Sequence, residues 1–167
     1  MTAPSPDLTC LTPLDEDTLA CLASSAVLDA DPEDVMPFVS GPPGWTPDRI
    51  AAFLAFHRSR RGGLRGPHAE EGWAVVAGGS PSGIVRLRVV SPGRFEVGLW
   101  LARSVRGVGV GAAALHAAAG RAIALGAGRL VAETTCDNIA ALAALRRLGA
   151  RLEEPASDKR VRAELAL

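Results

Sequence analysis

The feature that most limits how this chain can fold is a glycine-rich segment between a strand pattern and a helix pattern. Residues 106–112 read RGVGVGA, with glycine at every second position from 107 to 111. Glycines let the backbone turn so that consecutive N–H groups converge, and a helix start adds unpaired N–H groups with a positive dipole end. The segment predicts a phosphate or pyrophosphate site, the alternative being a tight turn without a ligand.

Three classes of ligand use such a turn. A P-loop needs Lys and then Ser or Thr after its last glycine, and the alanine pair that begins at Ala112 excludes it. A dinucleotide site fits better, because Gly107, Gly109 and Ala112 satisfy GxGxxA and Glu133 follows at a suitable distance. Two features argue against a dinucleotide site. Residues 102–105 separate the strand from the turn, and the 55 residues after Ala112 are too few for a doubly wound sheet. Coenzyme A is the third class.

Hydrophobic periodicity predicts one α+β domain over residues 1–167. The acidic, proline-rich stretch 28–45 is expected to be a loop. Strands are expected at 9–14, 73–77, 84–90, 94–101, 129–134, 151–153 and 160–167. Helices are expected at 15–27, 47–60, 110–125 and from Asp137 or Asn138 to Leu148. Because short turns join the three central strands into an antiparallel meander, the sheet should be mixed and mostly antiparallel.

Charge and cysteine content narrow the range of partners. Net charge is zero, which gives no reason to expect nucleic acid. Residues 1–48 hold nine of the 18 acids and no Lys or Arg, which indicates either a solvated acidic face or a rim that attracts a cationic substrate. Three unpaired cysteines, an N-terminus unlike a signal peptide and no long apolar run predict a cytoplasmic protein without a membrane span. Three histidines without ligand spacing predict no metal site.

Residues 95–150 resemble the core of the GNAT superfamily of N-acetyltransferases. The family signature R/Q-x-x-G-x-G/A matches Arg106, Gly109 and Gly111, and the family's downstream Asn and helix match Asn138 through Gly149. The EVGLWLA stretch that begins at Glu96 is similar to the subgroup of ribosomal-protein N-terminal acetyltransferases.

This resemblance implies a central sheet that is splayed at the cofactor site and flanked by about four helices. The strands at 94–101 and 129–134 would diverge to admit acetyl-CoA. The backbone of Leu99, Trp100 and Leu101 would pair with the pantetheine arm like an added strand. Asn138 would reach the pantetheine or the adenine side, or only cap its own helix. The pyrophosphate would be held by Arg106, Gly107, Val108, Gly109, Val110, Gly111 and Ala112.

The proton-transfer residues are less well specified. Glu96 is the candidate general base, because it is a charged residue on an otherwise apolar strand; the alternative is a solvent-facing residue or an ion-pair partner of Arg86 or Arg88. The chain departs from the family at the general acid, since Leu145 stands where many members have Tyr and Ala141 where the ribosomal subgroup often has Ser. Cys136 is a candidate substitute acid or a buried, inert thiol.

The resulting prediction is an acetyltransferase that transfers an acetyl group from acetyl-CoA to a primary amine in a ternary complex. The acceptor would be a peptide N-terminus, an aminoglycoside-like compound or a small amine, and the acidic segment 15–48 favours a cationic one. The alternative is an acyl-CoA-binding or sensing module without catalysis, which the departures at Leu145 and Ala141 favour. An exposed sheet edge near the C-terminal strand suggests a homodimer.

Overall fold

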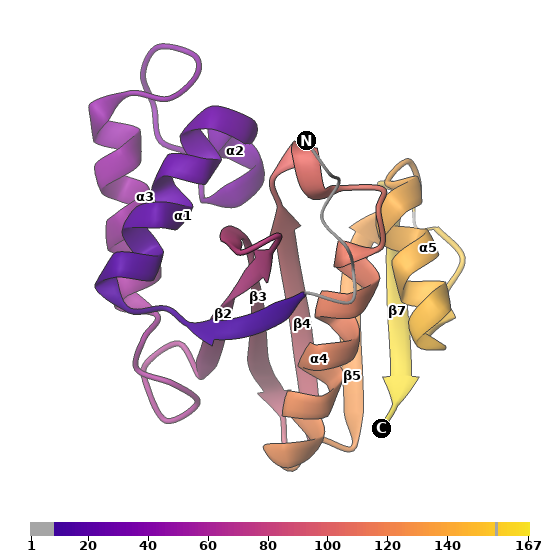
Figure 1. Cartoon of the computed structure of the whole chain (residues 1–167). Helices are drawn as coiled ribbons and strands as arrows, with labels where there is room; N and C mark the ends of the chain where they lie inside the picture. The colour runs from indigo at the N-terminus through magenta and orange to yellow at the C-terminus, as the bar shows by residue number, and fades with distance from the viewer. Residues whose placement is uncertain (1–8, 156) are drawn as a thin grey trace.

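Seven strands form one mixed sheet in the computed structural model, which describes residues 9–155 and 157–167 (Figure 1). The spatial order is β1-β2-β3-β4-β5-β7-β6. The strands are β1 (Cys10–Pro13), β2 (Glu70–Ala77), β3 (Ser80–Ser91), β4 (Arg94–Leu101), β5 (Arg129–Thr135), β6 (Arg151–Leu152) and β7 (Arg160–Ala166). The helices are α1 (Glu16–Asp29), α2 (Pro32–Val35), α3 (Pro47–Ser59), α4 (Val110–Ala124), α5 (Ile139–Leu148) and the 3-10 helix η2 (Arg103–Val105).

Local sequence sets the helix ends. Asp15 caps α1, and its side chain accepts a hydrogen bond from the Thr18 N–H at 2.8 Å. Thr46 caps α3 in the same way, and Pro47 follows at the first helical position. Gly149 ends α5 with φ of 90°, a left-handed conformation that glycine adopts without strain.

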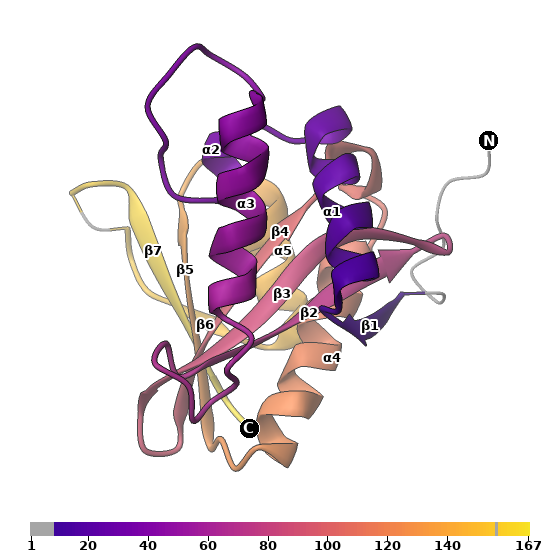
Figure 2. The same cartoon turned by 90° about the vertical axis from the view of Figure 1, so that its left-hand side faces the viewer.

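Alternation along the strands gives the sheet two buried faces. On one face Val85, Leu87 and Val97 join a cluster with the alanines of α4, whose small side chains let that helix approach the sheet closely. On the other face Ala74 and Ile84 join a cluster made mainly by α1, α2 and α3. Figure 2 shows α1 and α3 in front of the sheet and α4 behind it. The sheet is therefore covered by helices on both sides.

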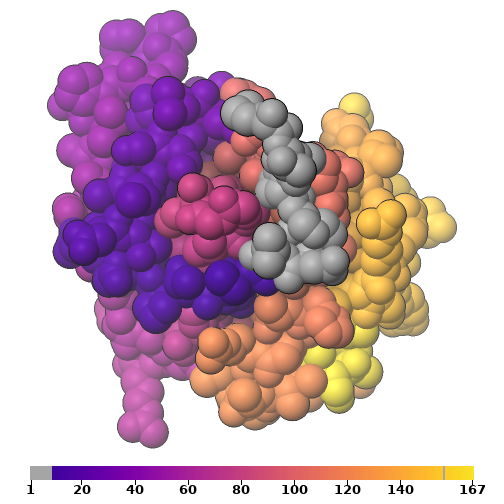
Figure 3. Space-filling model, viewed as in Figure 1, coloured from indigo at the N-terminus to yellow at the C-terminus, as the bar shows by residue number. Residues whose placement is uncertain are grey.

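Strands β4 and β5 are the only parallel pair in the described residues, and they separate after three residues. Arg94 to Glu96 pair with Arg129 to Val131, and no further pairing follows. Beyond that point β4 stays paired with β3, and β5 with β7. The predicted divergence of these strands is confirmed. The space-filling view shows the N-terminal helices and the C-terminal elements on opposite sides of the molecule (Figure 3).

The structure differs from the sequence prediction at a few boundaries. The expected loop 28–45 contains α2, a four-residue helix that Pro32 begins and that is too short to show a 3.6-residue period. Strand β2 begins at Glu70, earlier than expected, because charged residues extend it beyond the apolar run. The C-terminal strand β7 is an inner strand, since the two-residue β6 covers part of its outer side.

Candidate active site

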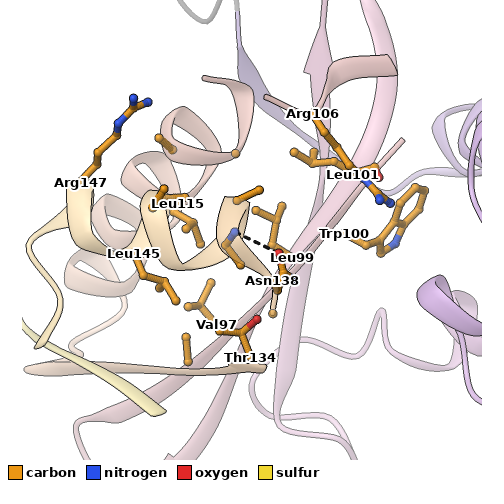
Figure 4. A pocket seen from close by; sticks show the side chains of 18 of the residues that line it. Val97, Leu99, Trp100, Leu101, Arg106, Leu115, Thr134, Asn138, Leu145 and Arg147 are labelled. Carbon is orange, nitrogen blue, oxygen red and sulfur yellow. Dashed lines mark hydrogen bonds between the residues drawn. The ribbon is translucent and has the colours of Figure 1, made fainter. Parts of the chain in front are cut away.

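A cavity of about 520 Å³ lies where β4 and β5 separate, and we call it the splay cavity (Figure 4). Its walls come from β4, from the start of α4, from β5 and from α5. The apolar side chains of Val97, Leu99, Leu115 and Leu145 surround it. Four alanines of α5 complete the wall: Ala140, Ala141, Ala143 and Ala144. These short side chains leave room for an elongated ligand beside the free edge of β4.

The glycine segment forms the mouth of the splay cavity. Gly107 and Gly109 have φ of 77° and 94°, values that few residues other than glycine adopt. The first helical hydrogen bond runs from the Ala113 N–H to the Gly109 carbonyl at 3.1 Å. The six N–H groups of residues 107–112 have no hydrogen-bond partner in the described part of the chain. Together with the helix dipole, these donors fit a pyrophosphate, and the geometry meets the requirement that the sequence predicted.

Arg106 lies beside this turn, with its side chain folded back toward β4. Its Nε donates a hydrogen bond to the Leu101 carbonyl at 2.8 Å, and the residue lines the splay cavity (Figure 4). The bond fixes the guanidinium beside the turn, and its Nη groups have no hydrogen-bond partner in the described residues. Val110 is fully buried beneath the turn, and the Val108 side chain is exposed, so both are placed to contribute backbone N–H groups.

Strand β4 presents alternate residues to the splay. The Ala102 N–H bonds to the Ser82 carbonyl on the β3 side, so by alternation Trp100 also directs its backbone groups toward β3. Leu99 and Leu101 then direct theirs toward the space that β5 has left. The Leu101 carbonyl is occupied by Arg106, which leaves the Leu99 backbone as the main edge for an extended ligand.

Asn138 has the capping role that was considered for it, and its contact with a coenzyme stays a prediction. It caps α5, because its Oδ1 accepts a hydrogen bond from the Ala141 N–H at 3.1 Å, and it also lines the splay cavity (Figure 4). Leu145 and Ala141 line the same cavity and offer no proton donor there. Thr134 is the hydroxyl-bearing residue of the cavity wall.

A second cavity of about 420 Å³, which we call the side cavity, lies on the opposite face of β4, between the sheet and α2 and α3. It shares five lining residues with the splay cavity: Asp34, Gly98, Leu99, Trp100 and Glu133. The two cavities therefore meet across β4. A reaction between a ligand in one and a ligand in the other would occur at this junction.

The acidic segment is only partly available to a ligand. Asp29 accepts a hydrogen bond from the Ser104 N–H at 2.8 Å, and Asp31 forms an ion pair with Arg103. The bonds to Ser104 lower the pKa of the Asp29 carboxyl, although slight burial opposes them. These contacts tether the start of α2 to η2, just before the glycine turn. Asp34 is the member of the segment that lines both cavities.

Glu96 and Cys136 lie outside the walls of both cavities as far as the described residues define them. Glu96 forms ion pairs with Arg86 at 3.0 Å and Arg88 at 2.8 Å, the alternative that the sequence had left open. Burial raises the pKa of the Glu96 carboxyl, but the hydrogen bonds and charges of the two arginines outweigh it and leave that pKa lowered. Cys136 follows β5 directly, and its N–H bonds to the Lys159 carbonyl at 2.9 Å.

Sequence reasoning did not mark His57, Glu70 or Glu133 of the side cavity as acceptor-site residues. Asp34 lay in the acidic segment that was expected to favour a cationic acceptor. No motif marks them, because each comes from a different element. The described residues contain no cluster of three potential metal ligands, and none of their helices is long and apolar enough to span a bilayer.

A splayed mixed sheet with a glycine-built anion site at the splay defines a coenzyme A-dependent acyltransferase fold. Comparison with family models agrees, since residues 9–151 match the acetyltransferase (GNAT) domain. The chain belongs to the GNAT family of acetyltransferases. A search of curated proteins found no match.

Solved structures share the fold at low sequence identity. RimL, a ribosomal L7/L12 alpha-N-protein acetyltransferase in complex with coenzyme A, is 17% identical, with a TM-score of 0.72 over 95% of this chain and 94% of that one. Mycobacterium smegmatis RimJ with CoA-disulfide is 18% identical, with a TM-score of 0.72 over 95% and 81%. The GNAT domain of S. lividans PAT is 21% identical, with a TM-score of 0.69 over 95% and 89%.

Proposed function

We propose that this protein transfers the acetyl group of acetyl-CoA to a primary amine by direct attack within a ternary complex. The observation that carries this proposal is the meeting of two cavities across β4, one with six unpartnered N–H donors and the other with charged side chains. Acetyl-CoA would lie in the splay cavity with its pyrophosphate at residues 107–112. The acceptor would lie in the side cavity. The three cysteines are free, which supports a reducing compartment such as the cytoplasm.

The reaction requires the acceptor nitrogen to lose a proton and to form a bond to the thioester carbonyl carbon. The C–S bond then breaks, and coenzyme A leaves as a thiolate that takes up a proton. Alignment of two substrates across β4 would supply much of the acceleration. The backbone N–H of Leu99, directed into the splay, is suited to polarise the thioester carbonyl.

Glu133 is the carboxylate that we favour as the proton acceptor, directly or through water. It lines both cavities from β5, and Arg160 at 3.0 Å and Arg162 at 3.5 Å fix its side chain. Glu96, which the sequence singled out, is two residues from Gly98 on the same face of β4 and would act through its ion pair with Arg86. The carboxylates of Asp34 and Glu133 at the junction favour an acceptor with a positive charge.

The general acid for the leaving thiolate is a separate question. Cys136 remains the thiol nearest in sequence to the end of β5, and Thr134 is a hydroxyl on the cavity wall. A coenzyme A thiolate released at the junction of the two cavities can also be protonated by water, so a dedicated acid is not required. A Cys136→Ala variant with unchanged turnover would remove the thiol from the mechanism.

A non-catalytic acyl-CoA-binding module is the second candidate function, favoured by Leu145 and Ala141 where the family often has Tyr or Ser. One experiment separates the two. Acetyl-CoA is added in a thermal-shift assay, where both candidates predict stabilisation. Thiol release is then followed with a panel of primary amines that includes peptides with free N-termini, an aminoglycoside and small diamines. Release above the rate of spontaneous hydrolysis establishes catalysis, and stabilisation without release from any amine supports the binding module.

A further inference from the structure

The two ends of the side cavity carry opposite charge, and this bears on the acceptor if the proposed function holds. At the junction with the splay cavity, Asp34 and Glu133 supply carboxylates. At the far end, Arg60, the residue after α3, and Arg86 of β3 stand on either side of Glu70 of β2. Glu96 also pairs with Arg86, and Arg88 pairs with Glu96, so three guanidinium groups face two carboxylates and positive charge is in excess by one.

The far end is incompletely satisfied by its own groups. Glu70 is only 7% exposed, yet Arg60 Nε lies 3.6 Å and Arg86 Nη1 3.5 Å from its oxygens, longer than good charge-assisted hydrogen bonds. Arg86 Nη1 is buried and has no hydrogen-bond partner in the described residues. Because buried charges are costly unless they are well paired, this arrangement suits a further polar group from a ligand.

His57 is a second buried polar group at the far end of the side cavity. The side chain packs edge-on against Phe53 with ring centroids 4.5 Å apart, is only 6% exposed and lines the side cavity. Burial, followed by the charges of Arg60 and Arg61, lowers the pKa of His57 to about 4. The imidazole is therefore neutral near pH 7, and its Nε2 has no partner in the described part of the protein. A buried imidazole nitrogen without a partner favours a polar ligand group at this end of the cavity.

Gly98 lets Arg86 lie flat against β4. A Cβ added at Gly98 would lie 2.7 Å from Arg86 Nε and 3.0 Å from its Cζ, so any other residue would displace the guanidinium. Glu96 holds the opposite side of the same group, with its Oε1 3.0 Å from Nη2. Arg86 is thereby fixed between the far end and the strand that separates the two cavities.

We propose that the side cavity binds an acceptor that carries a carboxylate as well as a primary amine. The amine lies at the junction beside Asp34 and Glu133, and the carboxylate binds Arg60 and Arg86. The rest of the side-cavity wall is largely apolar and includes Val35, Met36 and Ile84. The carboxylate is either the α-carboxylate of a free amino acid or the acidic side chain of the first residue of a peptide.

Matched ligand pairs test this inference by binding, without requiring catalysis. Isothermal titration with coenzyme A present compares L-leucine with L-leucinamide, and the peptide amide Asp-Ala-Ala with Asn-Ala-Ala. The two members of each pair differ by one carboxylate. The first pair tests the α-carboxylate of a free amino acid, and the second tests the acidic side chain of the first residue of a peptide. The preferred source should show binding at least about tenfold tighter for the carboxylate-bearing member, the effect of one charge-assisted contact.

Substitutions of the arginines test which side chains cause the preference for a carboxylate. Arg60→Gln should reduce that preference to less than about threefold, and Arg86→Gln should do the same. Arg61→Gln is the matched control, because Arg61 neighbours Arg60 in sequence but pairs with Glu16 at 2.5 Å and does not line the side cavity. Retained coenzyme A binding shows that each variant is folded.

The outcomes are distinct. The inference is overturned if the carboxylate-bearing member binds no more tightly than its partner in both pairs, if neither pair binds at about 10 mM, or if both arginine variants keep the preference. Carboxylate-dependent binding without thiol release would overturn the proposed acetyl transfer and leave the ligand class intact. Thiol release at equal rates from both members of each pair would support acetyl transfer and overturn the ligand class.

Discussion

The two cavities that meet at β4 are built from different parts of the chain. The splay cavity uses backbone N–H groups and short apolar side chains, mostly from one continuous stretch, residues 97–115, and from α5. The side cavity uses charged side chains that α2, α3, β2, β3 and β5 contribute singly. A backbone site depends on local φ values, whereas a side-chain site depends on which residues the fold brings together. The difference teaches that the proposed cofactor site is encoded locally and the proposed acceptor site by the whole fold.

Substitution at the junction of the two cavities should have the largest effect on catalysis, because acetyl transfer would take place there. Glu133→Gln keeps the shape of the side chain but removes the proton acceptor, and it should lower kcat by roughly 100-fold, the usual range for a general base. Glu96→Gln should lower kcat by less than about tenfold, because that residue acts through Arg86. Steady-state kinetics measures both, and acetyl-CoA affinity should be unchanged. A larger loss in Glu96→Gln than in Glu133→Gln would reverse the assignment.

A change in backbone conformation should damage only the cofactor side. Gly109→Val places a β-branched residue at φ of 94° and tilts the free N–H groups, so acetyl-CoA affinity should fall by about 30-fold. Gly120→Ala is the control, since Gly120 lies within α4 with open space around it and its replacement should leave affinity unchanged. Calorimetric titration with acetyl-CoA measures the difference. Equal affinities in the two variants would argue against the turn as the pyrophosphate site.

The acceptor side should also make the fold sensitive to acid. His57 has its pKa lowered to about 4 in the folded state by burial and by Arg60 and Arg61, whereas an unfolded histidine has an ordinary value near 6.5. As the pH falls below about 6.5, the histidine is protonated in the unfolded state before it is protonated in the folded state. Stability is therefore full above about pH 6.5 and falls as the pH drops toward 4, by roughly 2 kcal/mol at pH 5.

Urea unfolding between pH 7.5 and 5 measures this loss. His57→Gln should abolish most of the pH dependence in this window, and His116→Gln, at an exposed position of α4, should keep it. A wild-type protein whose unfolding free energy is flat over the same range would contradict the burial of a neutral imidazole.

The smallest effect is expected at the tether between the two regions. Arg103→Gln removes the ion pair with Asp31 on the surface, so stability should hardly change. Acceptor KM should rise by about two- to threefold, because Asp34 lies on the segment that the tether holds. Arg65→Gln is the control, because it makes the same substitution at a residue that lines neither cavity. An unchanged acceptor KM would show that Asp34 is positioned without the tether.

The backbone geometry of the splay cavity follows from the sequence for physical reasons. The glycines at 107 and 109 determine backbone conformation directly, and the alternation of β4 determines which side chains face each cavity. The divergence of β4 and β5 followed from the family resemblance rather than from any residue pattern. The helix α2 was missed because four residues carry no periodicity.

The acceptor side could not be predicted in the same way. Asp34, Glu70 and Glu133 are separated by 36 and 63 residues in the chain, and nothing local distinguishes them from surface acids. Two of the acids that the sequence grouped with Asp34 serve instead as tethers, Asp29 to Ser104 and Asp31 to Arg103. Only the register of β2, β3 and β4 shows that Glu70 lies within reach of Arg86.

The tether has a consequence for the order in which the substrates bind. Asp29 and Asp31 join the wall of the side cavity to η2, and η2 leads directly into the glycine turn. Closure of that turn on a pyrophosphate would steady the segment that carries Asp34 before any acceptor arrives. We therefore expect a sequential ordered mechanism in which acetyl-CoA binds first and coenzyme A leaves last. A coenzyme product inhibitor should then compete with acetyl-CoA and not with the amine.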